Sequence, residues 1–224
     1  MHSRARSLTG PVDLSSAGSP TPVQSLRVDG PFALGLLASI KLVEEHGINL
    51  YAGYCQWAYW ALGWLVDPEE GARGLRQALE AYMAQGNKAD APLFHGMLAE
   101  LEGAARGPDS ALKLIDQGLK IAEETGGRFM DPYLYRLRGD ILLKRDPADF
   151  APAEDAYRTA IAIAKRQGAR SYELLASLSL AKLRQSTGRP NDAHAVLAPL
   201  LESFSATPEM PEIAVAQALM ARLA

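Results

Sequence analysis

Residues 153–168 read AEDAYRTAIAIAKRQG, and this stretch decides the fold. Ala153, Tyr157, Ala160 and Ile161 stand at relative positions 0, 4, 7 and 8, which places them on one face of an α-helix. Gly168 follows 15 residues after Ala153 and is a residue that commonly ends helices. The stretch therefore predicts an amphipathic helix with small residues where a neighbouring helix can approach closely.

The same spacing occurs in four copies along the chain. The glycines that end the first three are separated by 40 and 42 residues, and Pro208 takes the place of glycine in the fourth. A proline three residues before the small residue marks the first turn of three of the helices. Asp67 precedes the first of these prolines and predicts an N-cap. The copies begin at Gly71, Ala111, Ala153 and Ala193, and the terminating glycines are Gly86, Gly126 and Gly168.

A second helix is predicted between each terminating glycine and the next start signal. The resulting pairs lie near 50–86, 90–126, 131–168 and 170–207, with one helix near 33–46 and a terminal helix at 209–223. Helix pairs joined by short turns predict an all-α fold, a right-handed α-solenoid of antiparallel pairs with about ten helices. We expect residues 31–224 to form this repeat domain and residues 1–30, which lack apolar periodicity, to be a disordered leader.

Composition and motifs exclude several classes of function. The net charge of -3 over 224 residues argues against a nucleic-acid-binding protein. The single cysteine and the four widely spaced histidines give no metal-site spacing. No phosphate-binding loop, nucleophile elbow or zinc-protease motif occurs in the sequence. We therefore expect no catalytic residue, no metal, no cofactor and no enzymatic activity, in a soluble protein of a reducing compartment such as the cytoplasm.

An uncharged, aromatic-rich stretch at residues 48–66 admits two interpretations. Its 19 residues approach the length of a membrane span, but its aromatic residues run through the middle rather than at the two interfaces. The repeat frame explains it as an ordinary helix, so we expect no membrane partner. Trp57, Trp60 and Trp64 either pack in the core, which we favour, or provide a surface for docking or self-association into a homo-oligomer.

Charge is unevenly distributed along the repeats. Residues 67–127 carry 6 basic and 11 acidic side chains, whereas residues 128–189 carry 12 basic and 7 acidic ones. Solvated faces of opposite sign would explain this difference. A partner with complementary charges at its two ends would explain it as well.

The repeats resemble a tetratricopeptide-type array. Ala153 and Tyr157 match its A-x3-aromatic element, although the period exceeds the usual 34 residues and approaches that of HEAT and armadillo repeats. Residues 134–143, 164–174 and 193–199 are similar to the carboxy-terminal repeats of large bacterial signalling proteins. Those proteins join a class III nucleotide (adenylate or guanylate) cyclase domain or a DNA-binding domain to a regulatory NTPase, as in the class of the maltose-regulon activator.

The resemblance implies a non-catalytic protein–protein interaction or scaffold module of a bacterial signalling or regulatory system. Its partner would be a protein or peptide bound in a concave groove lined by the first helix of each pair. The alternative is a C-terminal sensory fragment of a nucleotide cyclase or NTPase-linked regulator, acting in cis on domains that this chain lacks. Placing the family's groove positions on the repeat frame implies Gln56, Trp60, Glu100, Arg136, Asp140, Lys144, Lys182 and Gln185. Arg136, Asp140 and Lys144 follow i, i+4 spacing, so pairing among themselves is an alternative role.

Overall fold

The computed structural model describes residues 59–61, 63, 67–204 and 211–223, and the regular secondary structure of this part is entirely helical. The prediction of an all-α fold is therefore confirmed at this level. The chain divides into two compact units, Met1–Gly86 and Asn87–Ala224. The expected leader at residues 1–30 and the expected helix near 33–46 lie outside the described residues.

The first unit contains α3 (Pro68–Ala84), which starts at the cap that the sequence predicts. The Asp67 carboxylate accepts a hydrogen bond of 2.8 Å from the Glu69 backbone N–H, and Pro68 occupies the first turn. A Cβ atom placed on Gly71 would lie 2.3 Å from the Cα atom of Gly63, which is also helical. Two helical backbones therefore meet at Gly71, and only glycine permits this approach.

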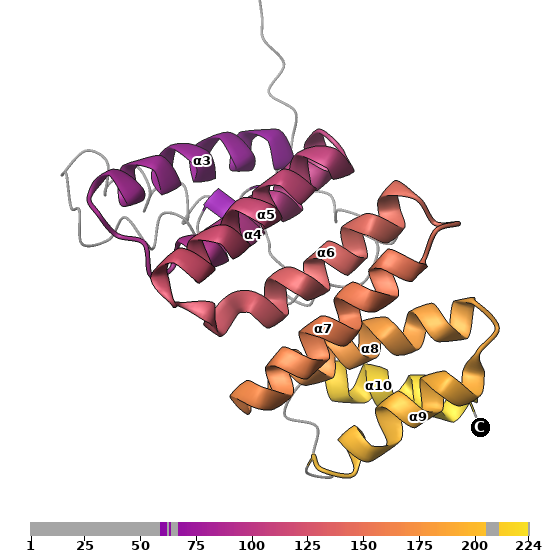
Figure 1. Ribbon diagram of the computed structural model, residues 1–224. Helices are drawn as coiled ribbons and strands as arrows, with labels where there is room; N and C mark the ends of the chain where they lie inside the picture. The colour runs from indigo at the N-terminus through magenta and orange to yellow at the C-terminus, as the bar shows by residue number, and fades with distance from the viewer. Residues whose placement is uncertain (1–58, 62, 64–66, 205–210, 224) are drawn as a thin grey trace, which may run out of the picture. The chain divides into compact units, whose positions relative to one another are not determined.

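The second unit contains seven α-helices and one 3-10 turn among its described residues (Figure 1). Each α-helix contacts the next one along the chain, and α4 also contacts α6, α6 contacts α8, and α8 contacts α10. The elements are α4 (Ala91–Ala105), α5 (Pro108–Thr125), η2 (Arg128–Met130), α6 (Asp131–Arg145), α7 (Ala151–Gln167), α8 (Arg170–Ser186), α9 (Pro190–Leu201) and α10 (Pro211–Leu223).

All three predicted glycine stops have the expected backbone geometry, and Gly86, just after α3, has a φ of 83°. Gly126 ends α5 with a φ of 72°, and Gly168 ends α7 with a φ of 67°, both in the left-handed region. The fourth copy differs, because α9 ends at Leu201, well before Pro208. Pro199 removes one helical N–H donor there, and the Ser203 hydroxyl donates a hydrogen bond to the Leu200 carbonyl oxygen.

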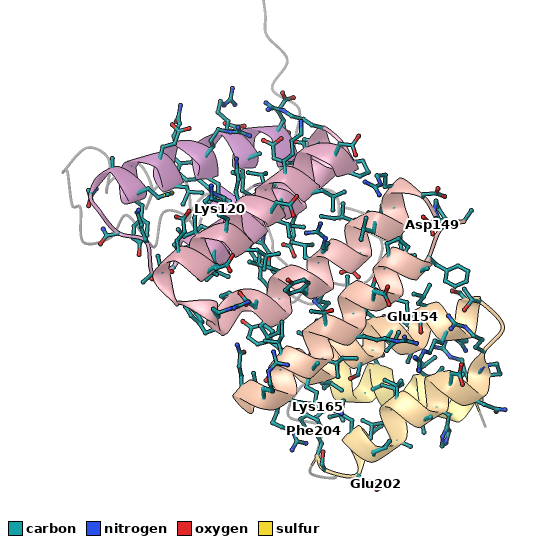
Figure 2. The ribbon with its side chains drawn as sticks, viewed as in Figure 1. Lys120, Asp149, Glu154, Lys165, Glu202 and Phe204 are labelled. Carbon is teal, nitrogen blue, oxygen red and sulfur yellow. The ribbon has the colours of Figure 1, made fainter. Side chains whose placement is uncertain are left out.

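The core follows the sequence repeat closely. Positions 0 and 4 are buried in all four copies, and position 8 is buried in α3 but only partly buried in α5, α7 and α9. In contrast, Lys120 on α5 and Lys165 on α7 extend into solvent (Figure 2). The buried residues at positions 0 and 4 are Gly71 and Leu75, Ala111 and Ile115, Ala153 and Tyr157, and Ala193 and Leu197.

Candidate partner-binding face

Helix α6 carries an ion pair at the centre of the candidate site. Arg136 Nη1 donates to Asp140 Oδ2 at 2.7 Å, and the two side chains are only 12% and 21% exposed. The second oxygen of the same carboxylate, Oδ1, accepts the Tyr157 hydroxyl from α7 at 2.7 Å. Both carboxylate oxygens of Asp140 therefore have a partner from within the protein.

Helix α4 contributes the acidic side chain Glu100 to the same region. Glu100 is buried. The burial of Tyr133 and the nearby charge of Glu100 raise the pKa of Tyr133 well above its ordinary value. The Arg136 guanidinium lies 5.9 Å from the centroid of the Tyr133 ring. Burial alone would lower the pKa of Arg136, but the charges of Asp140 and Glu100 raise it. Arg136 Nε is enclosed and has no hydrogen-bond partner.

Helix α8 brings a second cation, Lys182, toward this group. Lys182 is partly buried, and burial lowers the pKa of its ammonium group. The charge of Asp140 opposes this shift, while Arg222 on α10 and Arg136 on α6 lower the pKa further. Among the residues that the structure describes, Lys182 forms no ion pair within 4.0 Å. We call the group formed by Glu100, Tyr133, Arg136, Asp140, Tyr157 and Lys182 the inner polar cluster.

The structure thus brings together four of the residues placed at the groove by register. Glu100, Arg136, Asp140 and Lys182 come from α4, α6 and α8, and the pairing of Arg136 with Asp140 is confirmed. Lys144 lies one turn further along α6 and is exposed. Sequence reasoning missed Tyr133 and Tyr157, whose ring positions depend on contacts between helices.

The remaining predicted residues are separate from this cluster. Gln185 on α8 is partly buried, and no polar contact joins it to the cluster. Trp60 belongs to the first unit and is only 7% exposed, which favours core packing over a docking surface at this position. Gln56, Trp57 and Trp64 lie outside the described residues.

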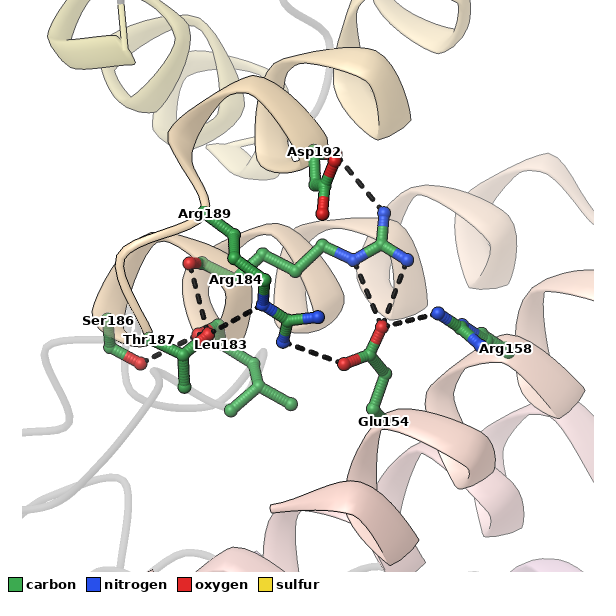
Figure 3. A network of polar contacts seen from close by, with 8 residues as sticks. All are labelled: Glu154, Arg158, Leu183, Arg184, Ser186, Thr187, Arg189 and Asp192. Carbon is green, nitrogen blue, oxygen red and sulfur yellow. Dashed lines mark hydrogen bonds and ion pairs between the residues drawn. The ribbon is translucent and has the colours of Figure 1, made fainter.

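A second polar network, centred on Glu154 of α7, was not anticipated from the sequence (Figure 3). The Glu154 side chain is 7% exposed, and its Oε1 accepts from Arg158 at 2.6 Å and from Arg184 at 3.0 Å. Its Oε2 accepts from Arg189 at 2.7 Å, and the Arg189 guanidinium also lies 5.4 Å from the centroid of the Phe150 ring.

The Glu154 network joins three consecutive parts of the chain. Arg184 lies near the end of α8 and also donates to the Asp192 carbonyl oxygen of α9 at 3.2 Å, so one buried carboxylate connects α7 with α8 and α9. The i, i+4 spacing of Glu154 and Arg158 was a visible signal in the sequence. The contacts of Glu154 with Arg184 and Arg189, which lie 30 and 35 residues away in sequence, gave no such signal. Because both oxygens of the Glu154 carboxylate are paired with arginines of the same protein, the network indicates a structural connection rather than a binding site.

The residues that the structure describes contain neither a metal-site cluster nor a candidate membrane span. That part of the chain holds no group of three His, Cys, Asp or Glu side chains placed to bind a metal ion. None of its helices is both long and apolar enough to cross a lipid bilayer. Comparison with protein families gives no matching family model, and no curated protein matches the chain.

Proposed function

We propose that this chain is a non-catalytic protein–protein interaction module of a bacterial signalling or regulatory system. Its partner, a peptide or protein segment, binds across the first helices of successive pairs. The observation that carries the proposal is the inner polar cluster, in which charged side chains from α4, α6 and α8 lie near enough to shift one another's pKa. Burying charged groups costs stability unless each is well paired, so such a cluster favours a binding role over a purely structural one.

The helix contacts support the architecture that this function needs. We propose a right-handed α-solenoid of antiparallel pairs, resembling tetratricopeptide arrays and the repeats of cyclase-linked and NTPase-linked regulators. The contacts of α4 with α6 and of α6 with α8 join the first helices of the predicted pairs, and the terminal helix α10 contacts α8 in turn. In a solenoid such helices form one continuous surface for an extended partner.

Peptide display against the purified chain tests this proposal. Selected peptides are resynthesised, and their affinities are measured by calorimetry for the wild type, Lys144→Glu and Lys113→Glu. Lys144 is exposed on α6 beside the inner polar cluster, while Lys113 is exposed on α5. Arg136 is a poor position for charge reversal, because a carboxylate there would face Asp140 and threaten folding.

We expect Lys144→Glu to change the affinity about tenfold, the size of one charge-assisted contact, while Lys113→Glu leaves it unchanged. Circular dichroism checks that both variants keep the helical content of the wild type. Peptides that bind both variants as tightly as the wild type would place the binding surface elsewhere and defeat the proposal.

A further inference from the structure

We propose that Met130 is a redox-sensitive modification site. A peroxide in solution oxidises its thioether to the sulfoxide, and the Tyr172 hydroxyl then holds the new oxygen atom. Neither side chain belongs to the inner polar cluster, so the site is independent of the proposed function. Its basis is the position of Met130, the hydrogen bond to its sulfur, and the contrast with the other described methionines.

Met130 lies on the turn that joins α5 to α6. It is the last residue of η2 and is partly buried, between Phe129, which is 46% exposed, and Asp131, which is buried. The Gln167 side chain donates to the Arg128 carbonyl oxygen at 2.9 Å, so the turn is also attached to α7. Met130 is therefore open to a small oxidant while the turn that carries it is held in place.

The sulfur of Met130 already has a hydrogen-bond donor. Tyr172, in the first turn of α8, donates its hydroxyl hydrogen to Met130 Sδ at 3.3 Å, across 42 residues of sequence. A thioether is a weak acceptor, whereas a sulfoxide is polar. A polar oxygen that is partly buried costs stability unless it is hydrogen-bonded. Because the Tyr172 hydroxyl is in place to donate, the folded protein accommodates oxidised Met130.

The other described methionines lack this arrangement. Met97 on α4 is 1% exposed, so a peroxide reaches it poorly, and a sulfoxide there would be enclosed in the core. Met83 on α3 and Met220 on α10 are partly buried, but no described residue donates a hydrogen bond to the sulfur of either one. Among the described methionines, Met130 is thus the one whose sulfoxide would find a donor.

The reaction balances with hydrogen peroxide as the only co-reactant. A lone pair of Met130 Sδ attacks one peroxide oxygen, an S–O bond forms, and the O–O bond breaks. The departing hydroxide takes the proton of the transferred oxygen and leaves as water. Sulfur loses two electrons and the peroxide gains two. Methionine sulfoxide reductase, supplied with a thiol reductant, reverses the change, so the site can cycle between two states.

Peroxide treatment of the full chain, followed by peptide mass spectrometry, tests which methionine reacts. We expect Met130 to gain one oxygen atom under mild treatment that leaves Met97 reduced. Incubation with the reductase should then remove that oxygen. Met97 reacting as fast as Met130, or Met130 staying reduced, would overturn the proposal.

Urea unfolding of the oxidised and reduced forms tests the role of Tyr172. Oxidation should lower the urea midpoint of Tyr172→Phe more than that of the wild type, because the sulfoxide has lost its donor. The Met130→Leu variant should respond little to the same treatment. Tyr135→Phe, which removes a partly buried tyrosine hydroxyl from α6, is the matched control and should behave as the wild type. Equal losses in the wild type and Tyr172→Phe would overturn the proposal.

A second readout does not depend on a variant that must fold. The tyrosines of the wild type are labelled with ¹³C at Cζ, the carbon that carries the hydroxyl, and NMR spectra are recorded before and after oxidation. The Tyr172 resonance should move on oxidation and return after the reductase has acted, while the Tyr135 resonance stays in place. A Tyr172 resonance that does not move would overturn the proposal. None of these results bears on peptide binding, which the display experiment decides.

Discussion

Tyr157 on α7 donates its hydroxyl hydrogen to Asp140 Oδ1 on α6 at 2.7 Å, although 17 residues separate them in sequence. Tyr157 also occupies position 4 of the sequence repeat and is 2% exposed. One residue therefore belongs both to the apolar core of a helix pair and to the inner polar cluster. Changes at Tyr157 should reveal how strongly the core and the cluster depend on each other.

Tyr157→Phe should lower the free energy of unfolding by about 1–2 kcal/mol, because Asp140 Oδ1 loses a partly buried hydrogen bond while the ring packing is kept. Urea unfolding followed by circular dichroism measures this change. Tyr135→Phe on α6 is the matched control, since Tyr135 is only partly buried, and it should change stability by less than about 0.5 kcal/mol. Equal effects of the two substitutions would mean that the hydrogen bond contributes nothing.

Gly139→Ala should destabilise the protein even though alanine is the better helix former by about 1 kcal/mol. A Cβ atom on Gly139 would lie 2.4 Å from Cε1 of the Tyr157 ring, which is itself buried. The ring would have to move, at a cost of about 1–3 kcal/mol. Gly103→Ala on α4 is the control, because its Cβ would meet only the Ala111 Cβ atom at 3.3 Å. Thermal unfolding should rank Gly139→Ala as clearly the more damaging change.

Glu154→Gln should lower stability at neutral pH by about 3 kcal/mol, because three arginines lose the carboxylate they share. Burial opposes the charged form, but hydrogen bonds from Arg189 and Arg184 outweigh it and lower the pKa of Glu154 below 4.5. Its contribution is therefore fully present above about pH 4.5, and it is lost as the pH falls through the pKa of the folded state.

The measurement for Glu154 is the free energy of unfolding as a function of pH. The difference between the wild type and Glu154→Gln should shrink once the pH falls below about 4.5. Glu124→Gln on α5 removes a more exposed carboxylate, 3.8 Å from Lys120, and should cost less than about 1 kcal/mol. A pH-independent difference for Glu154→Gln would show that shape, rather than charge, explains its effect.

His95→Gln should flatten the pH dependence of stability in the weakly acidic range. Burial lowers the pKa of His95 below 6.5, and its Nδ1 lies 2.8 Å from the Ala91 carbonyl oxygen. The unfolded chain binds the proton more readily, so the wild type should lose stability as the pH falls below about 6.5. His194→Gln, at an exposed site on α9, is the control. Parallel curves for the wild type and His95→Gln would contradict this assignment.

The sequence alone determined the helices of the described chain and much of their buried faces. The cap at Asp67 and the stops at Gly126 and Gly168 follow from local backbone chemistry, which neighbouring residues specify. The pairing of Arg136 with Asp140 follows from the helical period, because residues four apart share a face. The early end of α9 was missed because the expected stop at Pro208 took no account of Pro199, which lies in the last turn, or of Ser203, which lies just past the helix and donates to the Leu200 carbonyl oxygen.

Only the tertiary structure decided which partners meet across helices. Asp140 pairs with Tyr157, and Glu154 with Arg184 and Arg189, through the distance and rotation between packed helices. The distance and rotation between two helices depend on how their side chains pack over the whole interface. One example is the Tyr157 ring, which fills the space beside Gly139. The helical period determines on which face of its helix a charged side chain lies. The packing of the helices determines which side chain of a neighbouring helix it pairs with.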